Sequence, residues 1–339
     1  MSKYSFKNDY SEGAHPKIIE KLLQTNYEQE DGYGYDQYST QATELIKTQL
    51  KSFAADIYFV SGGTQANLIA ISAILKPYES IIATNISHIA THETGAIEAT
   101  GHKINIVTHQ YGKLTIKLIQ ETIHNHTSEH MVKPKAVFIS NATELGTIYR
   151  KSELYSLSAF CRDNGLFLYL DGARLGVALT SINNDLTLAD IAECVDVFYI
   201  GGTKNGALLG EAIVINNNLL KENFRFYMKQ KGALLAKGRL LGIQFLTLFK
   251  DNLFFEISQH ANNMALKLAQ GLKSAGYSFL VPYESNQLFP ILPHAVISKL
   301  SLKYNFYVWD KIDNDNSIVR LVTSWATSEM MVDNFIQDL

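Results

Sequence analysis

Charged side chains follow apolar runs at several places along the chain, and these are the places where chemistry is expected. Asp171 ends the run that begins at Leu168, and Arg174 follows three residues later. Lys204 stands in a glycine-rich turn just beyond the apolar run 195–200. Burial of such a lysine lowers its pKa and makes a neutral amine available for attack on an aldehyde. Each residue also has an ordinary explanation: Asp171 could cap a helix or pair with Arg174, and Lys204 could reach water.

A Gly-Gly-Thr turn lies between an expected strand and an expected helix nearer the N-terminus. Gly62, Gly63 and Thr64 directly follow the apolar run 56–60 and precede a helix-like stretch at 65–75. Backbone N–H groups at a helix N-terminus suit a phosphate dianion. An ordinary tight turn with Thr64 as the N-cap would have the same sequence. The turn has neither the G-x-G-x-x-G nor the P-loop pattern, so dinucleotides and nucleoside triphosphates are not indicated.

The combination of these features is more specific than any one of them. Open parallel sheets bind ligands at the carboxyl ends of their strands, and the Gly-Gly-Thr turn, Asp171 and Lys204 all fall at that edge. Pyridoxal phosphate requires three such partners: a lysine for its aldehyde, a carboxylate that keeps its pyridine nitrogen protonated, and donors for its phosphate. The sequence therefore predicts a pyridoxal phosphate site.

Two further residues could complete such a site. His88 follows the next expected strand and could stack on the pyridine ring. It could also be a structural histidine or, with His92 four residues later, a metal ligand, although no third ligand is evident. Arg320 lies mid-strand in an apolar context, where a clamp on a carboxylate would explain it, as would a surface-facing strand position. The basic stretch 229–239 is interpreted as a solvated helix face, with contact to a neighbouring subunit's phosphate as the alternative.

Short apolar runs that alternate with helical stretches must position these residues. Near-continuous apolar strands separated by helices predict a parallel sheet covered on both faces, and hence an α/β domain over 41–250. A long helix at 252–275, short strand-like pieces and a final helix from 328 predict a smaller α+β domain over 251–339. Residues 1–40 are expected to form an arm with a first helix near 17–24. Strands are expected at 56–60, 80–83, 103–107, 136–140, 166–170, 195–200, 212–215, 277–281, 286–291, 304–308 and 318–323.

The composition bounds the class of protein. Of 339 residues, 46% are hydrophobic, which excludes a disordered or collagen-like chain. The net charge of −3 gives no basic excess for nucleic acid, and no apolar run is long enough to cross a membrane. Cys161 and Cys194 cannot build a disulfide framework and fit reduced thiols in the cytoplasm. A soluble, cytoplasmic, globular protein is therefore expected, and the composition alone does not indicate its function.

At these residues the sequence resembles the threonine aldolase and β-eliminating lyase family of pyridoxal phosphate enzymes. The resemblance covers essentially the whole chain and is carried by Gly62-Gly-Thr-Gln-Ala-Asn67, the segment from His88 to Glu98, Asp171-Gly-Ala-Arg174 and Thr203-Lys204. It implies the aspartate-aminotransferase-like fold, fold type I, with a large cofactor domain and a small C-terminal domain. It also implies cleavage of β-hydroxy-α-amino acids, L-threonine and L-allo-threonine, to glycine and an aldehyde.

Other functions remain open at this point. The alternatives on the same site are another pyridoxal phosphate-dependent lyase reaction, such as β-elimination, or transamination, because a fold does not determine chemistry. A non-catalytic protein that keeps the cofactor site is a second class, and a metallohydrolase using His88 and His92 is a third.

The resemblance also implies roles for single residues. It makes Lys204 the Schiff-base lysine, places Asp171 on the pyridine nitrogen and stacks His88 on the ring. Further roles are phosphate and cofactor binding for Gly62, Gly63, Thr64 and Thr203, and contacts to the ring hydroxyl and the substrate carboxylate for Arg174 and Arg320.

Three more positions follow from the family pattern. Tyr33 matches a position that approaches the neighbouring subunit's cofactor in a homodimer or homotetramer. Asn8 stands where family members carry a serine that touches the carboxylate, and Glu144 stands where they carry a second histidine. The group that takes the substrate's hydroxyl proton, His88 or Glu144 through water, therefore stays open, as does the preference between threonine and allo-threonine.

Overall fold

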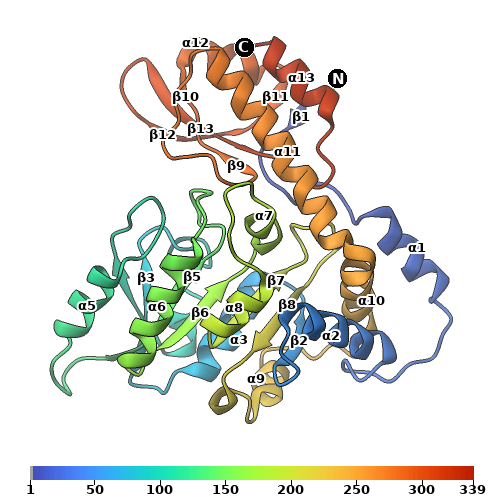
Figure 1. The fold of residues 1–339 in the computed structure, drawn as a ribbon, viewed down its shortest axis with the longest axis vertical. Coiled ribbons are helices and arrows are strands. Elements are labelled where there is room, and N and C mark those ends of the chain that lie inside the picture. The colour runs from blue at the N-terminus through green and yellow to red at the C-terminus, as the bar shows by residue number, and fades with distance from the viewer. Residues whose placement is uncertain (1–2) are drawn as a thin grey trace.

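The computed structural model describes residues 3–339, and its described part contains a central seven-stranded sheet with the order β2-β8-β7-β6-β5-β3-β4 (Figure 1). Neighbouring strands are parallel except that β8 runs antiparallel to both β2 and β7. The predicted α/β class with a mostly parallel sheet is confirmed. The strands are β2 (Asp56–Val60), β3 (Glu79–Thr84), β4 (Lys103–Val107), β5 (Lys133–Ser140), β6 (Phe167–Asp171), β7 (Val197–Gly201) and β8 (Glu211–Ile215).

Helices cover both faces of this sheet, which explains why its strands are apolar on both sides. Along β5, Val137 and Ile139 belong to one core cluster, while Ala136 and Phe138 belong to the other. The helices that contribute to the first cluster are α1 (Pro16–Gln24), α2 (Gln37–Leu50), α5 (Ile116–His124), α6 (Lys151–Asp163), α7 (Leu175–Leu179), α8 (Leu188–Cys194), α10 (Arg239–Phe249) and the start of α11 (Leu253–Ser274). Those that contribute to the second are α3 (Gly63–Ile74) and α9 (Phe224–Gln230).

A smaller antiparallel sheet lies above the central one and is joined to it by the long helix α11 (Leu253–Ser274) (Figure 1). Its core includes Leu268 from α11, Val319 from β13 and Phe335 from α13, all fully buried. The elements of this unit are β9 (Gln287–Leu288), β10 (Ile291–Pro293), α12 (His294–Ser301), β11 (Tyr304–Asn305), β12 (Tyr307–Lys311), β13 (Asn316–Val322) and α13 (Glu329–Gln337).

The start of the described chain is attached to this smaller unit. Strand β1 (Tyr4–Ser5) pairs in parallel with β11, and Phe6 is fully buried against the ring of Phe335. The helix predicted near 17–24 is α1, which packs instead beside α10 in the larger unit. The N-terminal stretch therefore contacts both units, and the predicted boundaries at 40 and 250 stay predictions.

Three strand predictions differ from the structure. The stretch 304–308 divides into β11 and β12, which pair with β1 and β13 respectively. In the stretch 277–281, only Phe279 forms a bridge, to Pro290. The stretch 286–291 divides into β9 and β10 because Pro290, which lacks an N–H group, interrupts the ladder between them.

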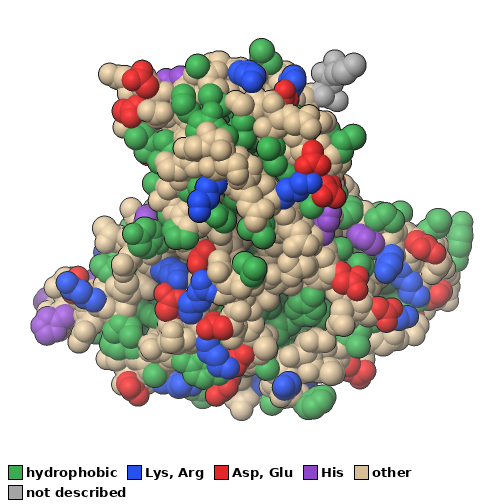
Figure 2. All heavy atoms as spheres, turned by 45° about the horizontal axis from the view of Figure 1, so that its top comes forward, with side chains coloured by type: hydrophobic (Ala, Val, Ile, Leu, Met, Phe, Trp, Pro, Cys, Tyr) green, Lys and Arg blue, Asp and Glu red, His purple; other side chains and the backbone are tan. Residues whose placement is uncertain are grey.

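Charges of both signs are interspersed with hydrophobic side chains over the face drawn in Figure 2. Within residues 3–339, no helix has both the length and the apolar character needed to cross a bilayer.

Candidate active site

A cleft of about 650 Å³ opens where the carboxyl ends of the central strands face the smaller sheet. It lies at the edge where open parallel sheets bind ligands. The structure brings ten of the twelve predicted site residues together in its lining, and Asn8 and Tyr33 lie outside it. The ten are Gly62, Gly63, Thr64, His88, Glu144, Asp171, Arg174, Thr203, Lys204 and Arg320.

Lys204 is held by a tight loop between β7 and β8. The N–H groups of Gly202 and Thr203 both donate to the carbonyl of Gly210, and the Gly210 N–H donates to the Thr203 hydroxyl at 3.0 Å. Throughout the described chain, no hydrogen bond or ion pair engages the Lys204 amine. Burial lowers the pKa of Lys204, and the nearby guanidinium of Arg174 lowers it further. The amine is therefore available as a nucleophile.

Asp171 ends β6 and is almost fully buried, with its carboxylate oriented by three donors. Its Oδ1 accepts from the Tyr199 hydroxyl at 2.5 Å and from the Ala173 N–H at 2.9 Å, and its Oδ2 accepts from Asn67 Nδ2 at 3.3 Å. The next residue must be glycine, because a Cβ on Gly172 would lie 1.8 Å from the Tyr199 carbonyl oxygen. This packing fixes the turn that presents the carboxylate to the cleft.

The N-terminus of α3 faces the same cleft. Gly62 is the N-cap, and no side chain of residues 3–339 caps this helix end. The first N–H groups of an α-helix lack intrahelical partners, so Gly63 and Thr64 offer donors to an anion. Gly63 has little room for a side chain, since a Cβ there would lie 3.0 Å from the Tyr199 hydroxyl.

His88 begins the short helix α4 (His88–Thr91), and its ring nitrogen Nδ1 lies 2.7 Å from Oε1 of the buried Glu93. A carboxylate there orients the imidazole and favours the proton on Nδ1. The ring of His92 lies 5.6 Å away. Residues 3–339 contain no group of three His, Cys, Asp or Glu side chains that could hold a metal ion.

Glu144 lies in the loop that follows β5 and is partly buried. Its Oε1 accepts from the Ser140 hydroxyl at 2.7 Å and from the His88 N–H at 3.1 Å, while Oε2 has no protein partner within the described range. Burial raises the pKa of the Glu144 carboxyl. A carboxylate whose pKa is raised toward neutrality is better matched to proton transfer at physiological pH.

The two arginines of the cleft differ in how fully they are engaged. Arg174 donates through Nε and Nη2 to the buried carboxylate of Asp9, at 2.7 and 2.9 Å. Arg320, on β13, donates through Nη2 to Gln287, while its buried Nε has no partner in the part of the chain that the structure describes. Burial lowers the pKa of Arg320 to about 10, so it is charged at neutral pH. Its guanidinium lies 5.4 Å from the ring centre of Trp309.

Asn8 and Tyr33 make other contacts in a single chain. Asn8 Oδ1 accepts from the Tyr10 N–H at 3.0 Å and the Ser11 hydroxyl at 2.9 Å, and it is the neighbouring Asp9 that reaches the site. Tyr33 is 45% exposed, and the Lys229 amine lies 4.8 Å from the centre of its ring. The roles assigned to Asn8 and Tyr33 stay predictions.

Sequence reasoning missed many residues that contact the predicted ones or line the cleft, including six that form hydrogen bonds at the site. Asn67 and Glu93 lie inside the motifs that carried the family resemblance, but nothing in the spacing gave them a role. Tyr199 could have been found, because a hydroxyl in a buried strand requires a partner. The six are Asp9, Asn67, Glu93, Tyr199, Glu211 and Gln287.

The donor set fits pyridoxal phosphate. The cleft combines an unengaged amine on Lys204, an oriented carboxylate on Asp171 and an uncapped helix end at Gly62. These match the cofactor's aldehyde, pyridine nitrogen and phosphate. The fold and the site together define a pyridoxal phosphate-dependent enzyme of fold type I.

Comparison with known proteins narrows this class. The family described as "Beta-eliminating lyase" matches residues 9–293. The chain therefore belongs to the β-eliminating lyase family, whose members are pyridoxal phosphate-dependent lyases.

Individual relatives agree with this assignment. The low specificity L-threonine aldolase of Pseudomonas aeruginosa is 32% identical over 338 residues, which cover 98% of this chain and 96% of that one. A solved structure of Leishmania major threonine aldolase superposes with a TM-score of 0.97 at 52% identity and covers 98% of each chain. An aspartate aminotransferase double mutant from Thermus thermophilus has a TM-score of 0.73 at 12% identity, covers 99% of this chain and 90% of that one, and shows the shared fold.

Proposed function

We propose that this protein cleaves the Cα–Cβ bond of β-hydroxy-α-amino acids, including L-threonine and L-allo-threonine, to give glycine and an aldehyde. The observation that carries the proposal is the Lys204 amine, which has no protein partner within residues 3–339 and shares a cleft with the oriented carboxylate of Asp171. The relatives named threonine aldolase, which match almost the whole chain, support this choice of bond over β-elimination or transamination.

Different residues of the chain would bind different parts of the cofactor. Lys204 would hold its aldehyde carbon, Asp171 its ring nitrogen, and the N-terminus of α3 with Thr64 its phosphate. Bound there, pyridoxal phosphate supplies an electron sink for the electron pair released when the Cα–Cβ bond breaks. His88 would lie against the ring, with its orientation fixed by Glu93. Thr203 fixes the loop that presents Lys204.

Arg320 is the group we assign to the substrate carboxylate. Its buried Nε lacks a partner in the described chain, and a carboxylate oxygen would satisfy it. Fixing the carboxylate orients the bonds at Cα, and so selects the bond that is broken. Arg174, two of whose nitrogens are taken by Asp9, would use its remaining nitrogen toward the cofactor's ring hydroxyl.

Glu144 is the group we assign to the substrate's hydroxyl proton. Its Oε1 is fixed by Ser140 and by the His88 N–H, so its unengaged Oε2 is the atom that would accept the proton. Burial raises the pKa of Glu144, which also allows the carboxyl to return the proton later in the cycle. His88, whose Nδ1 is engaged by Glu93, is the alternative through Nε2 or a water.

We also propose that the protein is a homo-oligomer, a dimer or a dimer of dimers, in the cytoplasm. Exposed Tyr33, Tyr35 and Phe226 lie outside the cleft of their own chain and would contact a second copy. Tyr33, or a side chain of the basic stretch 229–239, would then approach the partner's cofactor. The cytoplasmic assignment rests on Cys161 and Cys194, which are free and buried. A monomer at micromolar concentration in sedimentation would contradict the shared site.

Incubation of the purified, cofactor-loaded protein with L-threonine and L-allo-threonine tests the reaction. Equal amounts of glycine and acetaldehyde support the proposed cleavage. A 2-oxo acid with ammonia would instead indicate elimination, and consumption of threonine only in the presence of an added 2-oxo acid would indicate transamination.

A further inference from the structure

Gln287 is a buried residue of the cleft that none of the roles above uses. It lies on β9, is 1% exposed and lines the cleft between Arg320 and the loop that carries Glu144. We propose that Gln287 is a positioning residue. It directs the Arg320 guanidinium toward the substrate carboxylate and fixes the position of that guanidinium relative to the Glu144 loop. The inference rests on the proposed function, in which Arg320 binds the carboxylate.

The oxygen and the nitrogen of the Gln287 amide each face a neighbour of complementary hydrogen-bonding type. Oε1 accepts from Arg320 Nη2 at 2.5 Å, and Nε2 donates to the Thr143 carbonyl at 3.1 Å. The reverse orientation would oppose the amide NH₂ to the guanidinium and two carbonyl oxygens to each other, so the neighbours fix the orientation. Because Gln287 occupies Nη2 and leaves Nε unpartnered, it determines which nitrogen of Arg320 remains for an anion.

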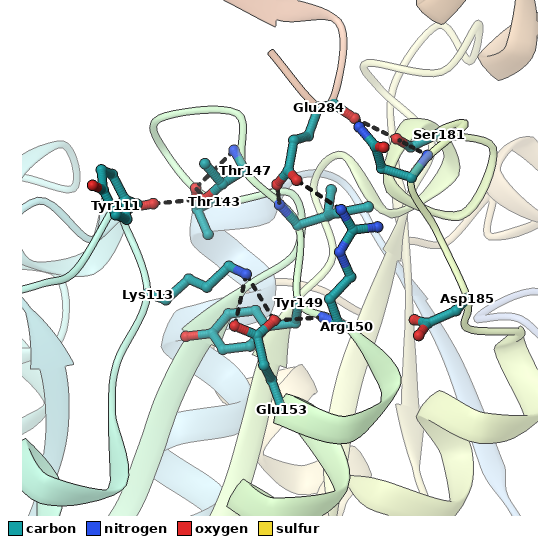
Figure 3. Close-up of polar contacts among 12 residues, drawn as sticks. Tyr111, Lys113, Thr143, Thr147, Tyr149, Arg150, Glu153, Ser181, Asp185 and Glu284 are labelled. Atoms are coloured by element: carbon teal, nitrogen blue, oxygen red, sulfur yellow. Dashed lines mark hydrogen bonds and ion pairs between the residues drawn. The ribbon is translucent and has the colours of Figure 1, made fainter. Parts of the chain in front are cut away.

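The segment that carries Gln287 is itself attached to the Glu144 loop at a second point. Glu284 Oε2 accepts from the Ile148 N–H at 2.9 Å, and Oε1 pairs with Arg150 Nη2 at 2.8 Å (Figure 3). The Ser181 hydroxyl donates to the Glu284 carbonyl at 2.5 Å. Between these points Gly146 packs so closely that a Cβ there would lie 2.7 Å from the Gln287 carbonyl oxygen.

These contacts give the two attachments different roles. Glu284 accepts from the Ile148 N–H and pairs with the Arg150 guanidinium, both beyond the cleft, and forms no hydrogen bond or ion pair with Arg320. Gln287 alone, among the described residues, forms hydrogen bonds with both Arg320 and Thr143, the residue that precedes Glu144. Loss of Glu284 should therefore loosen the loop, whereas loss of Gln287 should change the recognition of the carboxylate.

The test compares two ligands that differ only at the carboxylate. Titration calorimetry on the cofactor-loaded protein measures the binding of glycine and of glycinamide to the wild type, Gln287→Met, Gln287→Glu and the control Glu284→Gln. Gln287→Met removes both amide contacts at similar volume, and Gln287→Glu places an anion beside Arg320 that competes with the substrate carboxylate. We expect both variants to weaken glycine by about tenfold or more and glycinamide by less than about twofold. Glu284→Gln should leave the ratio of the two affinities at its wild-type value.

Several results would overturn the inference. One is equal weakening of both ligands by Gln287→Met and Gln287→Glu, which indicates only a structural role. Another is unchanged glycine binding in both variants. A third is a wild type that binds glycine no better than glycinamide, since Arg320 would then recognise no carboxylate for Gln287 to position. The reaction itself is tested separately: a wild type that discriminates between the ligands but releases no acetaldehyde from threonine contradicts the proposed function and leaves the role of Gln287 supported.

Discussion

Replacement of Glu211 by glutamine should stabilise the protein near pH 8 but not near pH 5. Glu211 opens β8, is 4% exposed and accepts the Gly202 N–H at 2.9 Å. Burial raises the pKa of its carboxyl from 4.5 to about 7. The folded protein therefore keeps this proton over a range in which the unfolded chain has lost it, so the unfolding free energy falls as the pH rises from about 4.5 to 7 and then levels off.

The size of the effect follows from the same values. Since a tenfold change in an equilibrium corresponds to about 1.4 kcal/mol, a pKa raised from 4.5 to about 7 costs the fold roughly 3 kcal/mol once Glu211 is ionised. A glutamine side chain at this position would be a neutral acceptor for the same N–H and would not have this cost. Glu211→Gln should thus match the wild type in stability near pH 5 and exceed it by roughly 3 kcal/mol near pH 8.

Urea unfolding of the cofactor-free protein, followed by circular dichroism at pH 5, 6, 7 and 8, measures this difference. The exposed Glu129→Gln serves as the control and should show no pH-dependent gain. A Glu211→Gln protein whose stability relative to the wild type is the same at pH 5 and pH 8 would refute the reasoning, because it would mean that the buried carboxyl ionises normally.

Three other predictions test the site. Arg320→Lys should raise KM for L-threonine by about tenfold or more, because an ammonium cannot replace the planar fork; an unchanged KM in steady-state kinetics would make Arg320 structural. Asp9→Asn should cost roughly 3–5 kcal/mol in urea unfolding, because it leaves the buried Arg174 charge unpaired. Asn8→Ala should cost less than about 1 kcal/mol, and equal losses at the two positions would contradict the assignment. Glu144→Gln should lower kcat for threonine cleavage by about 10²–10⁴-fold, whereas a normal kcat would assign the hydroxyl proton to His88.

The sequence predicts the central sheet well because its strands are buried on both faces. Uninterrupted apolar runs between helices have few other interpretations, and all seven expected strands of the large unit are present. The residues at the ends of these strands could be predicted for the same reason, since the topology alone brings Gly62, Asp171 and Lys204 to one edge.

The smaller unit and the partners of the site residues were harder to predict. Its strands are as short as two residues, and one expected strand is divided at Pro290. Asp9 lies 165 residues from Arg174 in the chain, and Gln287 lies 33 residues from Arg320. Pairing over such separations is decided by tertiary packing, which no local spacing encodes.

The central claim is that the cleft is built around Lys204 as the residue that holds pyridoxal phosphate. Borohydride reduction of the cofactor-loaded protein, followed by digestion and mass spectrometry of the peptides, tests this claim directly. The account predicts that the reduced cofactor is attached to Lys204 and that Lys204→Ala is unlabelled and inactive. Labelling of Lys229, Lys231 or Lys237 in place of Lys204, or full activity of Lys204→Ala, would contradict it.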